Sequence, residues 1–387
     1  MSKISEKKLT KYINSWSHSG KNELERPFSE RVKEGWQTFL KGEAALRQKI
    51  DEKRNSDELV AACLELLNPI FHDICFEMGY NGEKHELILT AEGDRAKLFP
   101  LIYFQKHAPK EVLNHWNIIV GRRPFNERKY CLQMFGQNIS MEEVQVWIEW
   151  QENKTAELFF YCEKLVPFLK EKENDAYWFM CVLLDQAVGE IPSIRYINRF
   201  ELLEQPKDGD SLSLDKLLDC LQKTLDLDAE EMFNAEKYCE TYTAYELKPN
   251  EDIKAGWRRD VFVGITSCVP LISEYLQGQS QIMDTFYQDG IIAGSLSYSV
   301  DCFTGEDRGK RILDFRDQLE EDILALAGED AVSFIGGASG IYCCYLDFIA
   351  WNPLKVLETA AEILKNKEIT QAGFYPFWND KQGIRLK

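Results

Sequence analysis

Two basic doublets are the residues of this sequence whose types best suit the binding of an anion. Arg122-Arg123 and Arg258-Arg259 each lie at the edge of a segment with strand-like composition. The chain has a formal net charge of −18, so a local excess of arginine could form an anion site or a partner site. Ion pairing with the abundant carboxylates is the alternative interpretation, and the overall charge balance favours it.

A third charged pair, Asp94-Arg95, directly follows an expected strand. Open α/β sheets place ligands beyond the ends of their strands, so a pocket is expected first at this point. The segment lacks the glycine pattern of a phosphate-binding loop. Together with Arg122 and Arg123, Asp94 and Arg95 define a candidate site for a hydrolase or a transferase.

The glycine-rich segment 336–340 invites comparison with a catalytic turn. Its Ser339 stands where the nucleophile elbow of α/β-hydrolases has a serine, but the elbow also needs glycine two residues later, and that position is Ile341. It does not match a dinucleotide-binding loop either, because a strand-like run follows where a helix is required. We therefore expect a tight hairpin or a bulge here, with a ligand loop as the alternative.

Metal and cofactor motifs are missing from the sequence. None of the five histidines forms an H-E-x-x-H motif or pairs with cysteine at zinc spacing. The segment 305–310 is one residue short of a phosphate loop, and Arg311 stands where Ser or Thr would hold magnesium. Cys343 and Cys344 point to opposite faces of an expected strand, so they are poor joint ligands. We expect neither a metal nor a cofactor.

The elements that must position these residues are clearest from 314 to 351. Apolar residues recur at spacings of three and four, which predicts one buried helix face: Ile312, Phe315, Leu319, Ile323 and Leu326. Gly328 is the expected C-cap. Two apolar runs, 331–335 and 341–349, predict adjacent buried strands.

A β-helix-β unit is expected earlier in the chain, between residues 86 and 121. Its strands are 86–91 and 117–121, and the helical segments between them make a crossover of the length that joins parallel strands. Strict alternation predicts a further strand at 144–150, although a capping box at 140–143 predicts a helix there; we favour the alternation. A long apolar helix is expected at 176–188.

The excess negative charge is concentrated in residues 201–252. This segment holds 15 Asp and Glu against 5 Lys and no Arg, so 15 − 5 leaves a net charge of −10. An amphipathic helix is expected at 212–225, which indicates a helical connector with a solvated outer face; an interaction surface is the alternative. The expected fold is α+β, with two sheet-and-helix sandwich domains. The expected parts of the chain are an N-terminal arm, 1–27; a first domain, 28–205; the acidic connector, 206–255; and a second domain, 256–387.

Composition restricts compartment and partners. No apolar run approaches the roughly 20 residues of a membrane helix, and the N-terminal residues contain no apolar signal core. Eleven cysteines, an odd number at irregular spacing, do not suggest a disulfide framework. We expect a cytoplasmic protein that binds neither membranes nor nucleic acid, since nucleic-acid phosphates would be repelled. A basic protein partner is compatible with the charge.

Several stretches resemble bacterial families of unknown function: ELILTAEGDRAKLFPLIYF and WNIIVGRRP in the first half, and FRDQLEEDILAL with FIGGASGIYCCYLDFIAW in the second. The second pair of stretches also resembles ferredoxin-like domains related to regulators of ribonuclease E activity. The resemblance covers about a quarter of the chain and contains no catalytic motif. It implies an α+β fold with antiparallel strands and transfers no functional residue.

Two functional hypotheses follow from the sequence. The first is a non-catalytic binding or regulatory protein of a bacterial cytosol, with an immunity or inhibitor role against a basic partner. The second is the hydrolase or transferase with a site at Asp94, Arg95, Arg122 and Arg123. The residues do not decide whether the chain is an enzyme, and the lack of a catalytic motif favours the non-catalytic role. A pocket with convergent polar groups and a shifted carboxyl pKa would favour the enzyme.

Overall fold

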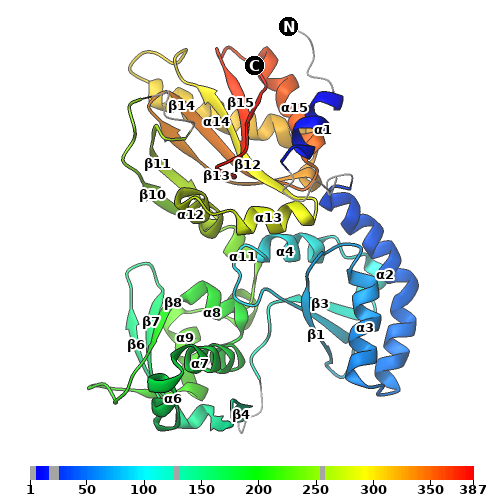
Figure 1. The fold of residues 1–387 in the computed structure, drawn as a ribbon, viewed down its shortest axis with the longest axis vertical. Helices are drawn as coiled ribbons and strands as arrows, with labels where there is room; N and C mark the ends of the chain where they lie inside the picture. The colour runs from blue at the N-terminus through cyan, green and yellow to red at the C-terminus, as the bar shows by residue number, and fades with distance from the viewer. Residues whose placement is uncertain (1–5, 17–25, 126–130, 253–257) are drawn as a thin grey trace. The chain divides into compact units, whose positions relative to one another are not determined.

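The computed structural model describes residues 6–16, 26–125, 131–252 and 258–387 (Figure 1). Contacts within the chain define two compact units. The discontinuous unit comprises Met1–Ile74 and Cys239–Lys387, and the inserted unit comprises Cys75–Tyr238, which interrupts the first in sequence. Helices make up 46% and strands 24% of the structure, in several sheets, so the expected α+β class is confirmed.

The discontinuous unit is built on a seven-stranded sheet in the order β10-β11-β13-β14-β12-β15-β16. All neighbouring strands in it are antiparallel. The strands are β10 Thr243–Glu246, β11 Val261–Thr266, β12 Ile292–Ser299, β13 Val332–Gly340, β14 Cys343–Ala350, β15 Ala372–Pro376 and β16 Ile384–Arg385. The helices are α1 Glu6–Asn14, α2 Phe28–Asp51, α3 Ser56–Leu67, α12 Val269–Gln277, α13 Gln281–Gln288, α14 Arg308–Ala327 and α15 Pro353–Asn366.

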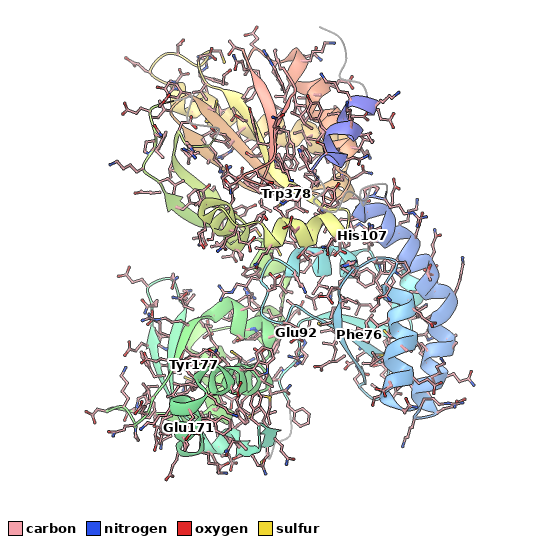
Figure 2. All side chains as sticks on the ribbon, in the orientation of Figure 1. Phe76, Glu92, His107, Glu171, Tyr177 and Trp378 are labelled. Atoms are coloured by element: carbon pink, nitrogen blue, oxygen red, sulfur yellow. The ribbon has the colours of Figure 1, made fainter. Side chains whose placement is uncertain are left out.

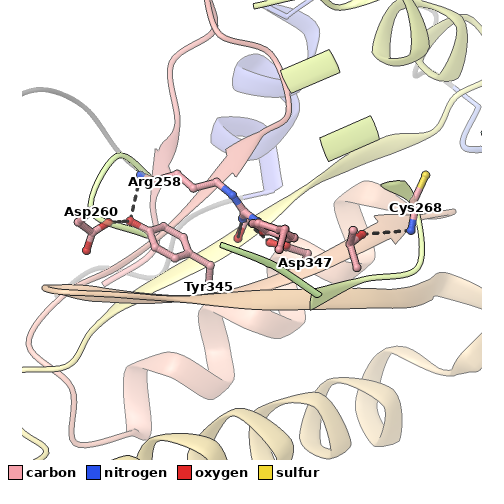
Figure 3. A network of polar contacts seen from close by, with 8 residues as sticks. Arg258, Asp260, Cys268, Tyr345 and Asp347 are labelled. Carbon is pink, nitrogen blue, oxygen red and sulfur yellow. Dashed lines mark hydrogen bonds and ion pairs between the residues drawn. The ribbon is translucent and has the colours of Figure 1, made fainter. Parts of the chain in front are cut away.

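The central strand β14 is buried on both faces, as its apolar sequence predicted. Side chains alternate along a strand, so Tyr345 and Asp347 share one face while Leu346 and Phe348 share the other. In Figure 3 a polar network lies on the face of the sheet that carries Tyr345 and Asp347. Helices pack against the opposite face. The α14 stripe is confirmed at Leu319 and Ile323, but Leu326 is 64% exposed and Ala327 takes its buried position.

The glycine-rich segment lies inside β13, and this corrects the expected position of the turn. The hairpin between β13 and β14 turns at residues 341–342. The register of the two strands shifts between Phe334 and Gly336. This shift is a β-bulge, the second of the two structures expected for this segment. Gly336 has a φ of 129°, and a Cβ there would lie 2.0 Å from the carbonyl oxygen of Ile265. Only glycine fits, for a structural reason.

Residues 6–16 of the expected N-terminal arm are packed on the discontinuous unit. In α1, Leu9 and Ile13 are buried, and Trp16 donates from Nε1 to the carbonyl oxygen of Gln382 at 3.0 Å. The rest of the expected arm, 1–5 and 17–25, lies outside the described residues. The first α2 residue, Phe28, packs against Trp351 with ring centroids 5.7 Å apart, so residues that were assigned to the first domain belong to the C-terminal sheet.

From β12 to β15 the elements follow the order β-α-β-β-α-β, with β12, β13, β14 and β15 as the strands. This is the element order of the ferredoxin-like motif. The sheet continues beyond it through β10 and β11 on one side and β16 on the other. The ferredoxin-like topology of the second half therefore stays a prediction, as does the family resemblance.

The inserted unit contains a three-stranded sheet, β1-β2-β3; a two-stranded sheet, β4-β5; and a four-stranded sheet, β8-β7-β6-β9. Its strands are β1 Cys75–Tyr80, β2 His85–Thr90, β3 Trp116–Val120, β4 Cys131–Met134, β5 Gln137–Ser140, β6 Gln145–Trp150, β7 Ala156–Tyr161, β8 Ile197–Leu202 and β9 Leu212–Ser213. Its helices are α4 Leu98–Lys106, α5 Lys110–Leu113, α6 Val166–Glu171, α7 Glu173–Val188, α8 Glu190–Tyr196, α9 Leu217–Leu225, α10 Ala229–Met232 and α11 Glu236–Cys239. Strands β2 and β3 are parallel, which confirms the β-helix-β prediction.

The acidic segment is not a connector over most of its length. Leu214, Leu217 and Leu221 are fully buried in the core that the inserted unit forms with α7 and the β6-β7 strands. The boundary between the units falls after Tyr238, so the divisions expected at 205 and 255 differ from those of the structure. The amphipathic helix was expected from the sequence, but the strands and the helix that cover its leucines belong to earlier parts of the chain.

In the part of the chain that the structure describes, no helix combines the length and the apolar character needed to span a bilayer.

Candidate functional site

The inserted unit has a cavity of ≈ 440 Å³ between its two larger sheets and the helices α7 and α8. One side is formed by residues that follow β2 and β3, including Glu92, Arg95 and Arg122. The other side is formed by α7, α8 and β8, including Tyr177 and Asp185. Glu92 and Tyr177 are labelled in Figure 2 and mark the two sides. The size is within the range of small-molecule sites.

The parallel pairing of β2 and β3 explains why charged residues distant in sequence meet here. Parallel strands end at the same edge of a sheet, so the chain leaves β2 at Ala91 beside the point where it leaves β3 at Arg122. The carboxylate of Glu190 holds both ends together. It accepts the backbone N–H of Ala91 at 2.9 Å and that of Arg122 at 3.1 Å.

Glu190 is placed by the junction of α7 and α8. Gly189 at this junction has a φ of 86°, and a Cβ on it would meet the carbonyl oxygen of Arg122 at 3.1 Å. The N–H of Glu190 donates to that same carbonyl oxygen at 2.9 Å. The Glu190 side chain is 1% exposed, and burial raises its pKa although two backbone N–H groups oppose the shift. Glu190 is thus a buried clamp in the cavity wall.

Arg122 carries the main positive charge on the strand side of the cavity. Its Nε lies 2.5 Å from Glu77 Oε1 and its Nη2 lies 3.0 Å from Glu92 Oε1. Burial alone would lower the pKa of Arg122, but hydrogen bonds and charge from these two carboxylates outweigh it and raise the pKa. The guanidinium is therefore held in a fixed orientation and remains charged.

Asp185 is the residue of the cavity that can change its charge near neutral pH. Burial, and then the negative charge of Glu190, raise the pKa of Asp185 to about 7, against a hydrogen bond with Ser193 and the charge of Arg122 that lower it. A carboxyl with such a pKa exists partly as acid and partly as base at neutral pH. Shifted carboxyls in a cavity are typical of functional sites.

Cys181 lines the same cavity one turn of α7 before Asp185. Burial and the charge of Asp185 raise the pKa of its thiol. A thiol is a weak nucleophile until it loses its proton, so the environment of Cys181 disfavours a catalytic thiolate.

The structure separates the four residues of the candidate enzyme site. Arg95 and Arg122 line the cavity. Asp94 instead stabilises its own turn, because its Oδ1 accepts the N–H of Ala96 at 3.0 Å. Arg123 stacks its guanidinium over the ring of Phe233 at 4.6 Å, and burial lowers its pKa. Two of the four residues proposed from the sequence therefore line the cavity, and the described contacts of Asp94 and Arg123 lie outside it.

Sequence analysis missed Asp185 and Glu190. Asp185 is the one acidic residue in the apolar run 176–188, and a lone carboxyl in such a run is a signal that could have identified it. Glu190 had no comparable signal, since its role depends on two backbone N–H groups from distant strands.

The second expected doublet lies in the discontinuous unit and divides in the same way. Arg258 is 3% exposed and pairs with Asp347, whereas Arg259 is exposed. The Tyr345 hydroxyl accepts the N–H of Arg258 at 2.9 Å and donates to Asp260 Oδ1 at 2.5 Å (Figure 3). Burial and then the bond to Asp260 raise the pKa of Tyr345. Its proton therefore stays in place to maintain the network.

Among the described residues, no group of three or more His, Cys, Asp or Glu side chains is placed to hold a metal ion. Compared with known proteins, the chain matches no family model, no curated protein and no solved structure. Its function therefore has to be inferred from the geometry and the charge of its own residues.

Proposed function

We propose that the chain is an enzyme of the hydrolase or transferase class that acts on a small polar substrate in the cavity of the inserted unit. Asp185 is the proposed general base and acid. The observation that carries the proposal is that a carboxyl with a pKa raised to about 7 lines a cavity beside a fixed guanidinium. This combination is what distinguishes a reaction site from an ordinary ion pair.

In the proposed hydrolytic step, the Asp185 carboxylate takes a proton from a water molecule as the water oxygen bonds to the electrophilic centre of the substrate. The carboxylic acid so formed returns the proton to the leaving group as its bond breaks. The pKa suits both halves of the cycle, because a group that titrates near the operating pH both accepts and donates efficiently. A transferase would replace the water with a hydroxyl or amine acceptor.

Arg95 is the proposed contact for negative charge that develops on the substrate. Arg95 lines the cavity, and the one hydrogen bond that its side chain makes to a described residue is a weak contact of 3.5 Å from Nη2 to the carbonyl oxygen of Ile197. Arg122 is engaged by Glu77 and Glu92 and provides the positive field behind the site. Trp178, 54% exposed at the same cavity, offers an aromatic face to the rest of the substrate.

The test is an activity screen with nitrophenyl esters, phosphate esters and glycosides, with the Asp185→Asn variant assayed in parallel. Asparagine keeps the shape of the side chain but cannot exchange a proton. We expect activity on one class, a rate that depends on pH around 7, and a loss of about 100-fold or more in Asp185→Asn, the usual contribution of general acid–base catalysis.

Glu173→Gln provides the matched control, because Glu173 is exposed on the same helix and does not line the cavity. This variant should retain the wild-type rate. Activity that survives unchanged in Asp185→Asn, or that is absent from every substrate class, would contradict the proposal.

A second candidate function is non-catalytic binding of a basic protein in the bacterial cytosol, as an immunity or inhibitor protein. The observation that favours it is the exposure of acidic side chains on the inserted unit: 9 of the 11 carboxylates in residues 201–238 are exposed, all except Asp215 and Glu236. A surface of this charge attracts a basic partner and speeds its association.

This second candidate is tested by affinity capture from bacterial lysate at low and at high salt. A basic partner held by these carboxylates should be recovered at low salt and weakened at high salt, because exposed charges are screened. Recovery of no basic protein at either salt concentration would count against it. The result is independent of Asp185, so Asp185→Asn should capture the same partner.

A further inference from the structure

We propose that the discontinuous unit contains a second binding site, which takes a phosphate group, in a cavity beside the buried Arg258. The cavity has a volume of ≈ 360 Å³. Three of its wall residues are the cations Lys248, Arg258 and Arg259, and none of the described residues that line it is Asp or Glu. A wall with this composition is unexpected in a chain with a net charge of −18.

Arg258 has one donor that the protein leaves without an acceptor. Its Nη1 donates to Asp347 Oδ1 at 2.6 Å and contacts Ser295 Oγ at 3.4 Å. Its Nη2 donates to Asp347 Oδ2 at 2.7 Å and to the Tyr245 hydroxyl at 2.6 Å. A guanidinium has five N–H donors, and these contacts engage four of them. The fifth, on Nε, is buried and has no hydrogen-bond partner among the residues that the structure describes.

An unpaired buried donor costs free energy, and native proteins leave few of them. The four engaged donors hold the Arg258 guanidinium rigidly. Asp347, which accepts hydrogen bonds from both Nη atoms, lies in β14 at the centre of the sheet. An acceptor that reaches Nε from the cavity would find the donor already held in this orientation. An oxyanion satisfies Nε with a charge-assisted hydrogen bond, which is stronger than a neutral one.

The charge balance of the cavity favours a doubly charged ligand. Asp347 neutralises Arg258, so the uncompensated charges are those of Lys248 and Arg259. Both side chains are exposed, and neither forms an ion pair with a residue that the structure describes. Two positive charges around a single Nε–H donor match a phosphate dianion better than a carboxylate.

The antiparallel pairing of β10 with β11 brings these cations together. The ladder extends beyond β10, since the N–H of Leu247 donates to Phe262 at 3.0 Å and the N–H of Asn250 donates to Arg259 at 2.7 Å. Asn250 therefore lies opposite Arg259, and Lys248 precedes it by two residues on the same side of the pair, so both cations reach the cavity although they lie 11 residues apart in sequence. Asn379, which also lines the cavity, donates from Nδ2 to the carbonyl oxygen of Tyr275 at 2.7 Å.

The experiment is calorimetric titration of the full chain with inorganic phosphate and, separately, with glycerol 3-phosphate at constant ionic strength. We expect saturable binding at one site. Arg259→Ala and Lys248→Ala should each weaken it by about tenfold, which corresponds to about 1.4 kcal/mol, the lower range for a hydrogen bond to a charged group. Tighter binding of the ester than of inorganic phosphate would identify an organic phosphate as the ligand, and the reverse would identify free phosphate.

Lys223→Ala is the matched control, since Lys223 is an exposed lysine of α9 in the other unit and should leave the affinity unchanged. A second readout is the NMR resonance of the Arg258 Nε–H group, which should shift on addition of phosphate and should not shift with equal concentrations of chloride. The proposal is overturned if neither phosphate compound binds saturably, or if the Lys248→Ala/Arg259→Ala double variant binds with wild-type affinity.

Discussion

Arg258 and Asp347 form a buried bidentate ion pair. The Nη1–Oδ1 and Nη2–Oδ2 distances are 2.6 and 2.7 Å, and the two side chains are 1% and 0% exposed. Burial alone would lower the pKa of Arg258, and the charge of Asp347 outweighs it and raises the pKa. Removing two charges from water costs several kcal/mol, so such a pair is stable only when both partners are present.

The first prediction concerns this pair. Asp347→Asn should destabilise the discontinuous unit by roughly 3–5 kcal/mol, because the Arg258 charge is left buried without a counter-charge. Replacing both residues, as Arg258→Met with Asp347→Leu, should restore much of the loss, since no charge is then buried. Urea unfolding of the three proteins measures the difference. A single variant as stable as the wild type, or a double variant no better than the single one, contradicts this account.

The second prediction concerns the pH dependence that Asp185 gives to stability. Its folded pKa of about 7 lies above its ordinary value of 3.8, so the folded state binds more protons between these two values. The contribution of Asp185 to stability is therefore fully present below pH 4, is lost as pH rises to about 7, and is constant above that. Asp185→Asn removes the titration and should raise the melting temperature at pH 8 relative to the wild type.

The same comparison at about pH 3 should show little difference, because the wild-type carboxyl is then mostly protonated in both the folded and the unfolded state. A carbon-13 NMR titration of aspartate carboxyls measures the pKa directly, and Glu190→Gln should lower it by removing the second cause of the shift. A wild-type Asp185 that titrates near pH 4 would falsify both this prediction and the proposed acid–base role.

The third prediction concerns the bulge in β13. Gly336→Ala should destabilise the discontinuous unit by about 2 kcal/mol or more, because alanine is strained at a φ of 129° and its Cβ meets the backbone of Ile265. Gly309→Ala is the matched control. Gly309 lies in α14 with open space around it, so alanine there should stabilise by about 0.5–1 kcal/mol. Equal effects of the two substitutions would show that the strain argument is wrong.

The fourth prediction concerns the membership of α9 in the inserted unit. Leu217 is fully buried, so Leu217→Ala should cost roughly 2–5 kcal/mol, as core leucine truncations do. Leu326 is 64% exposed, and Leu326→Ala should change the unfolding free energy by less than about 0.5 kcal/mol. Thermal unfolding of the two variants separates the cases. If α9 behaved as a solvated connector, Leu217→Ala would be as mild as Leu326→Ala.

Local patterns were sufficient wherever a short stretch of chain determines its own conformation. Asn55 caps α3, because its side-chain oxygen accepts the N–H of Glu58 at 2.9 Å, a contact between residues only three apart. At residues 140–150 both competing signals were real: the capping box is present on a three-residue turn, Met141–Glu143, and the alternating residues form β6. Periods of two and 3.6 follow from backbone geometry, so they are readable without knowing the partner surface.

Local patterns in the sequence were enough to predict the α+β class, most of the helices and strands, and the parallel pairing of β2 with β3. Contacts between distant segments put residues 28–74 in the same unit as the C-terminal sheet, put α9 in the inserted unit, and bring Asp185 and Glu190 near Arg122. The reason is physical. Hydrophobic periodicity predicts which face of a helix or strand is buried, but not which distant element packs against it. The pKa of a carboxyl depends on the residues that bury it, so it cannot be predicted from periodicity.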